Sequence, residues 1–181
     1  MLLDASKSSL LIVDVQDRLL PAMAEPERIV SRCQILLKAA EVLEIPVTIS
    51  EQYPKGLGRT VPELATNSAK VFEKLSFSCW RDIEMRKAFI ELHEHERPLI
   101  IVAGIEAHVC VLQSCIDLYN EGFGVFAVAD AMGSRKVESA ALAFDRLRGI
   151  GIQVINTEMA VFELIEKAGT PTFKTLSALI K

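Results

Sequence analysis

The segment that decides the fold covers residues 99–110 and reads LIIVAGIEAHVC. An apolar run rich in β-branched residues reaches Gly104, and a carboxylate, an imidazole and a thiol follow close together. A run that is apolar on both faces is typical of a strand covered by helices on both sides of a sheet. The polar residues therefore follow directly where a buried strand ends.

Similar apolar runs recur along the chain, and helical patterns separate them. The other strand candidates are residues 10–13, 47–49, 125–128 and 152–155, with a weaker one at 70–72. Helices are predicted over about 26–43, 82–93, 108–120, 137–147, 158–167 and 173–180, and an irregular region over 51–68. Strands that alternate with helices form right-handed crossovers and a parallel sheet. The prediction is one α/β domain over residues 1–181, a three-layer sandwich of Rossmann-type topology with helices on both faces of the sheet.

Composition narrows the possible partners and the compartment. The 181 residues are 50% hydrophobic and 24% charged, with a formal net charge of -4. The sequence has no basic block interleaved with aromatic residues, which argues against nucleic-acid binding. No stretch is long and apolar enough for a membrane span, and Asp14 interrupts the first apolar run, which argues against a signal peptide. A cytoplasmic protein with a small-molecule substrate is predicted.

Residues at the ends of the predicted strands suggest a nucleophilic site. Ligands of open α/β sheets bind beyond the carboxyl ends of the strands, where Asp14, Lys74 and Cys110 are expected. Cys110 falls near the first turn of a helix, whose N–H groups stabilise a thiolate and can hold an oxyanion. Lys74 would lower the pKa of the thiol further, and Asp14 could accept its proton as general base.

Each of these residues also has a purely structural interpretation. Cys110 could be a core residue and Asp14 a turn former, and Lys74 alone would mean nothing. His108 lies two residues before the thiol and points away from it on a helix, so a capping or surface role is expected. The remaining thiols show no zinc-like spacing. Cys33 and Cys115 lie on apolar helical stripes and are interpreted as buried core residues, whereas Cys79, beside Trp80 in a loop, could line a pocket or merely pack. Only the combination of three strand ends favours catalysis.

Several strings give the chain a resemblance to a known superfamily. They are LLIVDVQDRL (10–19), EQYPKGLG (51–58), KLSFSCW (74–80), GIEAHVCV (104–111) and NTEMAVFELI (156–165). With them the sequence resembles the isochorismatase-like cysteine hydrolases over nearly its whole length. Within that superfamily it is most similar to the subgroup of isochorismatase domain-containing proteins and their bacterial relatives.

The resemblance implies a six-stranded parallel sheet, a homo-oligomer and a defined set of site residues. It implies a catalytic triad of Asp14, Lys74 and Cys110, a cis peptide between Ile105 and Glu106, and an oxyanion hole formed by the backbone N–H groups of Glu106 and Cys110. The expected substrate pocket comprises Gln16, Glu51, Gln52, Tyr53, Phe77 and Trp80. Nicotinamidases of this superfamily bind a metal through histidines after the second strand. No histidine stands in the corresponding residues 50–53, so neither a metal nor another cofactor is expected.

The leading hypothesis is a metal-independent cysteine hydrolase that cleaves a small amide-like (C–N) or ester-like substrate through a thioester on Cys110. One alternative is vinyl-ether hydrolysis of the isochorismatase type, in which Asp14 acts as the acid and the thiol is passive. Another is a non-catalytic interaction protein on the same fold, because fold alone does not establish function.

Overall fold

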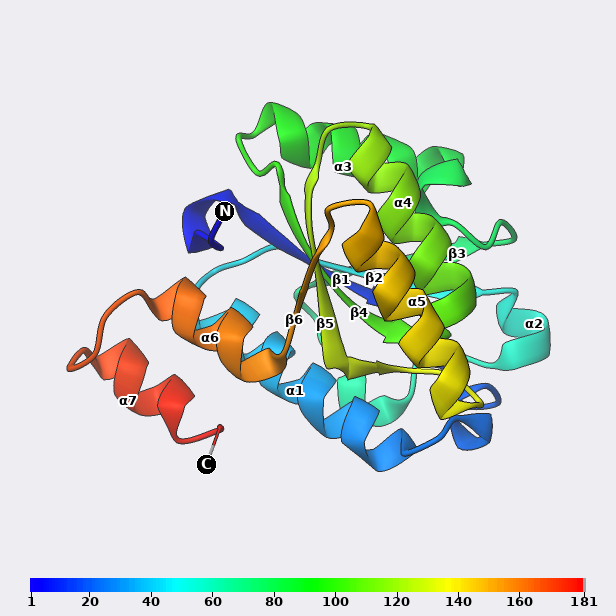
Figure 1. Cartoon of the computed structure of the whole chain (residues 1–181), viewed down its shortest axis with the longest axis horizontal. Coiled ribbons are helices and arrows are strands. Elements are labelled where there is room, and N and C mark those ends of the chain that lie inside the picture. Colours follow the sequence, from blue (N-terminus) through cyan, green and yellow to red (C-terminus); the bar gives the residue numbers. More distant parts are fainter. Residues whose placement is uncertain (181) are drawn as a thin grey trace.

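The computed structural model describes residues 1–180 and places six parallel strands in one sheet, in the order β3-β2-β1-β4-β5-β6 (Figure 1). The strands are β1 (Ser8–Val13), β2 (Val47–Gln52), β3 (Ala69–Lys74), β4 (Leu99–Ile105), β5 (Gly124–Gly133) and β6 (Gln153–Ile155). The α-helices are α1 (Pro26–Val42), α2 (Pro54–Leu57), α3 (Ile83–Glu94), α4 (Leu112–Asn120), α5 (Val137–Gly149), α6 (Thr157–Ile165) and α7 (Pro171–Ser177). This arrangement confirms the predicted six-stranded α/β fold.

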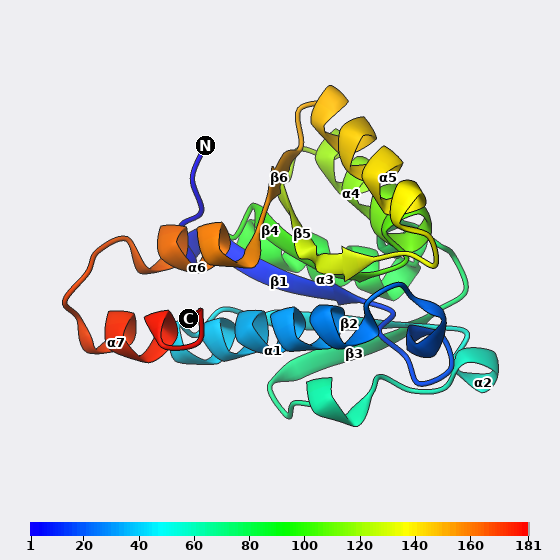
Figure 2. The same cartoon turned by 60° about the horizontal axis from the view of Figure 1, so that its bottom comes forward.

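Helices cover both faces of the sheet and enclose two apolar cores. The helices α1, α6 and α7 lie on one face, and α3, α4 and α5 lie on the other (Figure 2). Strand β4 is central, between β1 and β5, and all of its residues are buried. Its side chains point alternately into the apolar core on one face of the sheet and the apolar core on the other. No helix among residues 1–180 combines the length and the apolar character that a membrane span requires.

The structure differs from the sequence-based expectations at several element boundaries. The weak candidate at 70–72 is the edge strand β3, whose residues are largely exposed because an edge strand has a neighbour on one side only. Strand β5 extends to Gly133, well beyond the predicted 125–128. The region 51–68 contains the end of β2, the short helix α2 and the 3-10 turn η3 (Pro62–Leu64). The predicted helix over 108–120 starts as a π-helical turn, η5 (Ala107–Val111), before α4.

Register brings the expected site residues to one edge of the sheet. Val13 on β1 pairs with Ser50 on β2 and with Gly104 on β4. Gly104 has φ +115°, and a side chain there would collide with the backbone of Val13, so this position requires glycine. On β2, Gln52 pairs with Lys74 of β3. The ends of four neighbouring strands therefore meet around the residue that follows Val13, which is Asp14.

Candidate active site

Asp14 and Lys74 form a fully buried ion pair at this edge of the sheet. The Nζ atom of Lys74 lies 2.7 Å from Oδ2 of Asp14, and both side chains have no exposed surface. Nζ also donates to Oε1 of Gln52 at 2.8 Å and to the carbonyls of Ser76 and Phe77. Burial alone would lower the pKa of Lys74, but attraction to Asp14, and to the nearby thiols when they ionise, outweighs it and raises the pKa. The ammonium therefore stays charged in the core.

The carboxylate of Asp14 is held on both of its oxygen atoms. Oδ2 faces Lys74, and Oδ1 accepts a hydrogen bond of 2.7 Å from the hydroxyl of Ser50. Asp14 has φ 51°, in the left-handed region that few residues other than glycine adopt. Such backbone conformations persist where the surroundings enforce them and are frequent at functional sites. Here the N–H of Asp14 donates to the carbonyl of Ser50 at 3.0 Å, which fixes that turn.

Cys110 lies in η5, directly beyond β4, and is close to the pair. Burial, and then the charge of Asp14, raise the pKa of the Cys110 thiol above its ordinary value, and the carboxylate also acts on it as a hydrogen-bond partner. The charge of Lys74 lowers the pKa of this thiol, as expected, but by less than burial and Asp14 raise it. The expected net lowering of the pKa of this thiol is therefore not found. The resting thiol is neutral and lies beside a carboxylate that can take its proton.

Exposure, and not acidity, distinguishes Cys110 from the other thiols. All four cysteines are free, and burial raises the pKa of each of them. Cys110 retains 5% of its surface, whereas the other three are fully buried. A thiolate is the reactive form of cysteine and needs access to a reagent, so the three cysteines with no exposed surface are expected to be unreactive. Only Cys110 combines some exposure with a neighbouring base.

The segment before Cys110 is fastened to the end of β5. The peptide bond between Ile105 and Glu106 is cis, at the position where the resemblance implies one. The carboxylate of Glu106 accepts hydrogen bonds from the backbone N–H and from Nε of Arg135, at 3.2 and 3.0 Å. Nδ1 of His108 lies 2.8 Å from the hydroxyl of Ser134. His108 thus holds η5 against the residue after β5, which differs from the expected capping or surface role. Nothing in the sequence pattern singled out Arg135 or Ser134.

Three of the expected pocket residues hold the backbone around the triad. Gln16 is fully buried, and its amide bonds to the backbone of Gln52 and to the carbonyl of Gly58. Glu51 accepts hydrogen bonds from Thr60 and Arg59, which outweigh the effect of burial and hold the pKa of its carboxyl below the usual range. Gln52 orients Lys74. The polar groups of these three residues therefore fix the loop after β2, and few of their hydrogen-bonding atoms remain for a ligand.

The three expected aromatic residues have different environments. Tyr53 and Phe77 are exposed, by 52% and 54%. Tyr53 lines a cavity of about 710 Å³ together with Lys74, Leu75, Ser76 and residues 81–84. Trp80 packs against Phe89 and Phe123, and the guanidinium of Arg86 lies over its ring, so its indole belongs to an aromatic cluster of the core face. Lys74 contributes to the lining of this cavity although its side chain is buried, and neither Asp14 nor Cys110 lines it.

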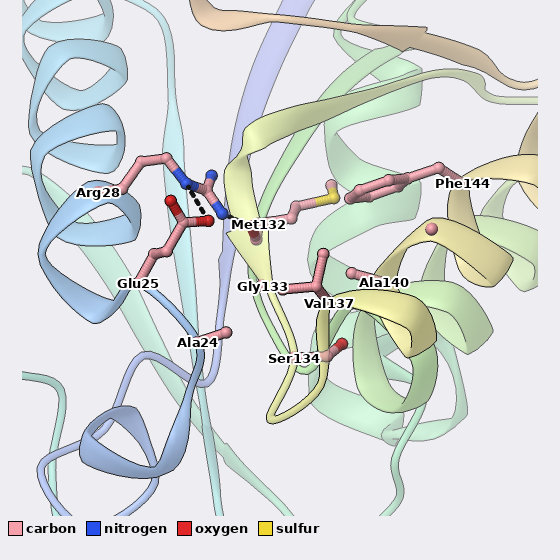
Figure 3. A pocket seen from close by; sticks show the side chains of 10 residues that line it. Ala24, Glu25, Arg28, Met132, Gly133, Ser134, Val137, Ala140 and Phe144 are labelled. Atoms are coloured by element: carbon pink, nitrogen blue, oxygen red, sulfur yellow. Dashed lines mark hydrogen bonds and ion pairs between the residues drawn. The ribbon is translucent and has the colours of Figure 1, made fainter.

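A second cavity, of about 140 Å³, lies between the start of α1 and the end of β5. Figure 3 shows Glu25 and Arg28 on one side of it and Met132 and Phe144 on the other. Arg28 pairs with Glu25 and donates to the carbonyls of Asp130 and Met132. Because these partners already engage its guanidinium, the cavity presents no unpaired charge to a ligand.

A metal centre has no support from the arrangement of side chains. Among residues 1–180, no group of three or more histidine, cysteine, aspartate or glutamate side chains is arranged to hold a metal ion. The segment after β2 supplies Glu51 and Gln52, which the contacts above already engage. Metal independence stays a prediction that requires a measurement.

Comparisons with known proteins agree with this fold. The isochorismatase domain matches residues 8–159. The secreted isochorismatase effector Isc1 of Phytophthora sojae is 34% identical over 179 residues, which cover 96% of this chain and 84% of that protein. The structure of the MAR1 ribonuclease from Caenorhabditis elegans has a TM-score of 0.90 at 32% identity, covering 99% of this chain and 92% of the other. The YcaC gene product from Escherichia coli, an octameric hydrolase of unknown specificity, has a TM-score of 0.91 at 25% identity, covering 99% and 90%. This chain belongs to the isochorismatase family.

Proposed function

We propose that this chain is a cysteine hydrolase that cleaves a small amide-like or ester-like substrate through a thioester on Cys110. The observation that carries the proposal is the buried Asp14–Lys74 ion pair beside Cys110, the cysteine that retains 5% of its residue surface. Burying two charges costs several kcal/mol per ion, so an ion pair of this kind is weak evidence for stability. Its position next to a nucleophile favours a role in chemistry.

In the proposed mechanism the thiol is activated as it attacks. The sulfur of Cys110 bonds to the substrate carbonyl carbon while its proton moves to Asp14. Lys74 pairs with Asp14 and holds its carboxylate in a fixed orientation before the transfer. The resulting tetrahedral oxyanion is held by the backbone N–H groups of Glu106 and Cys110, which donate to the charge that develops in the transition state.

The second half of the cycle reverses the proton transfer. Asp14 returns the proton to the leaving amine or alcohol as the C–N or C–O bond breaks, which leaves an acyl group on Cys110. Water then attacks the thioester while Asp14 takes a proton from it, and the acid is released with the thiol restored. One carboxylate thus serves as base and acid in turn, which suits a group whose two oxygens are held by fixed donors.

We further propose a small neutral substrate, a metal-independent reaction and a homo-oligomeric assembly. A net charge of -4 gives no electrostatic attraction to the phosphates of nucleic acid, which supports a small-molecule substrate. One structural relative is nevertheless named as a ribonuclease. The octameric YcaC supports an oligomer of this chain. A cytoplasmic location remains part of the proposal, while the relative Isc1 is named as secreted.

Two other functions give different results in the same assays. Vinyl-ether hydrolysis with Asp14 as the acid would survive Cys110→Ala, whereas thioester chemistry would not. A non-catalytic interaction protein would turn over no substrate and form no adduct. An RNA oligonucleotide in the substrate panel tests the ribonuclease reading, because a nuclease would shorten it and the proposed hydrolase would leave it intact.

The deciding experiment is intact-mass screening against small amides, carbamoyl compounds and esters, with and without a chelator. We expect an acyl adduct on Cys110 for at least one compound and unchanged formation of that adduct with the chelator. Cys110→Ala should abolish the adduct, and the matched control Cys115→Ala should keep it. Adducts that map to Cys115, or turnover that persists in Cys110→Ala, would refute the proposed nucleophile.

A further inference from the structure

We propose that Ser50 is a positioning residue that holds Asp14 ready to take the proton of Cys110, and that the thiol of Cys79 holds Ser50 in turn. This inference rests on the proposed function, because it assigns positioning roles to residues around Asp14, the proposed base. It adds a second layer of residues that neither the sequence pattern nor the triad contains.

The first contact is the hydrogen bond between Ser50 and Asp14. The hydroxyl of Ser50 lies 2.7 Å from Oδ1 of Asp14, and both residues are fully buried. A serine hydroxyl has one hydrogen, and an ionised carboxylate only accepts. The hydrogen of Ser50 therefore points to Asp14, and the Ser50 oxygen is left as an acceptor.

The second contact supplies a donor to that oxygen. The sulfur of Cys79 lies 3.6 Å from the hydroxyl oxygen of Ser50, within hydrogen-bond distance for sulfur. Cys79 is fully buried, and burial raises the pKa of its thiol to about 11. The thiol is therefore protonated at neutral pH and donates to Ser50, which leaves the Ser50 hydrogen committed to Asp14.

The segment that carries Cys79 is also fastened to the turn that carries the nucleophile. The backbone N–H of Cys79 donates to the hydroxyl of Ser114 at 2.9 Å, and that hydroxyl donates to the carbonyl of Cys110 at 2.7 Å. All of these groups are buried. The contacts thus link Asp14, Ser50, Cys79, Ser114 and Cys110, and they fix the base and the nucleophile relative to one another.

This arrangement has a consequence for the dependence on pH. The charged and titratable groups that face Asp14 are Lys74 from β3, Cys110 from η5 and Cys79 from the 3-10 turn η4 (Cys79–Arg81). A donor to the ionised form of a carboxylate favours that form. Without the Ser50 hydroxyl, the carboxylate of Asp14 would lose a fixed donor to its ionised form, so the pH profile of Cys110 labelling should be displaced to higher pH.

The test uses acrylamide as the probe and needs no knowledge of the substrate. The rate at which acrylamide alkylates Cys110 is followed by peptide mass spectrometry from pH 5 to 9. In Ser50→Ala, the pH at which labelling falls to half of its value at pH 7 should rise by about one unit. Ser50→Thr keeps a hydroxyl and should restore the parent profile. The matched control is Ser9→Ala, a buried strand serine at the other end of the sheet, which should leave the profile unchanged.

The possible outcomes separate this inference from the proposed function. A uniform loss of rate with no displacement of the profile in Ser50→Ala would mean that Ser50 is only structural and would overturn the inference. If Asp14→Asn labels as fast as the parent protein, the proposed function itself fails. Should Ser50→Ala not fold, Cys79→Ala and Cys79→Ser replace it. The inference then requires that Cys79→Ala displace the pH profile of Cys110 labelling in the same direction, and that Cys79→Ser displace it less. Profiles equal to that of the parent protein in both variants would refute it.

Discussion

Removing the charge of Asp14 should cost stability as well as activity, because it leaves the ammonium of Lys74 unpaired in the core. The variant Asp14→Asn keeps the size of the side chain, and asparagine tolerates the left-handed backbone at this position better than most residues. Its effect therefore reports on the charge and not on the shape of the residue or the strain of the turn.

The structure sets the magnitude of the loss. Breaking a buried ion pair on one side costs about 3–5 kcal/mol. Three neutral acceptors remain for Lys74 after the substitution, from Gln52, Ser76 and Phe77, so the low end of that range is expected. A loss of about 3 kcal/mol in a chain of this length lowers the melting temperature by about 6–12 °C.

A double-mutant cycle provides the assay. Urea unfolding is measured for the parent, Asp14→Asn, Lys74→Met and the double variant, with Asp145→Asn as the control from an exposed ion pair. The control should lose less than about 1 kcal/mol. The double variant carries no unpaired charge and should be at least about 2 kcal/mol more stable than the sum of the single losses predicts. Additive losses, or an Asp14→Asn variant as stable as the parent, would refute the reasoning.

Three further predictions concern the thiols and the segment before Cys110. Iodoacetamide should label Cys110 before the other three cysteines in the folded protein, and peptide mapping that finds Cys33 or Cys79 first would contradict this. Arg135→Ala should lower the rate of Cys110 labelling several-fold, because it leaves the carboxylate of Glu106, directly before η5, without the guanidinium. The free energy of unfolding should fall more than in Arg148→Ala, the control from an exposed ion pair, because the side chain of Glu106 is only 10% exposed. Equal labelling rates in both variants would count against a role for Arg135. Finally, stability should fall as the pH rises above about 9, because the pKa of each of the four thiols is raised in the folded protein. Burial raises the pKa of Cys33 to about 12, so above pH 9 this thiol keeps a proton that the unfolded chain releases and contributes about 1.4 kcal/mol per pH unit to the slope. Cys33→Ala should reduce the slope by that amount in urea titrations at several pH values, and an unchanged slope would exclude this thiol as a contributor.

The fold was predictable because its central strands are buried on both faces. The apolar run over 99–102 and its relatives at 10–13 and 125–128 carry the signal that distinguishes a covered parallel sheet. The edge strand β3 gave a weak signal, since its exposed side chains need not be apolar. The extension of β5 to Gly133 was missed because residues 129–133 read as a mixture of small and polar residues, and its pairing with Ile105 is a tertiary interaction.

Individual site residues were predictable where strand ends identified them, but their partners were not. Asp14 and Lys74 were expected at one edge of the sheet, and register and topology place them in contact. Ser50 was expected at the end of the second strand but was given no role, and Arg135 was not singled out, because serine and arginine are common near strand ends. Their roles depend on which atom lies opposite them in space, which only the folded chain determines. A family resemblance does not supply this information either, because it transfers motifs and not their surroundings.

The charge of the thiol is the point at which reasoning from residue types failed, and the reason is the balance between burial and attraction. A helix end and a lysine both favour a thiolate, and each effect is real. Yet the lysine is paired with Asp14, so the pair is nearly neutral when seen from Cys110, and the carboxylate of the pair disfavours a second negative charge. What remains is the cost of burial, which keeps the proton on sulfur. If Cys110 is the nucleophile proposed above, its thiol therefore has to lose its proton as it attacks, and the carboxylate of Asp14 lies close enough to take that proton.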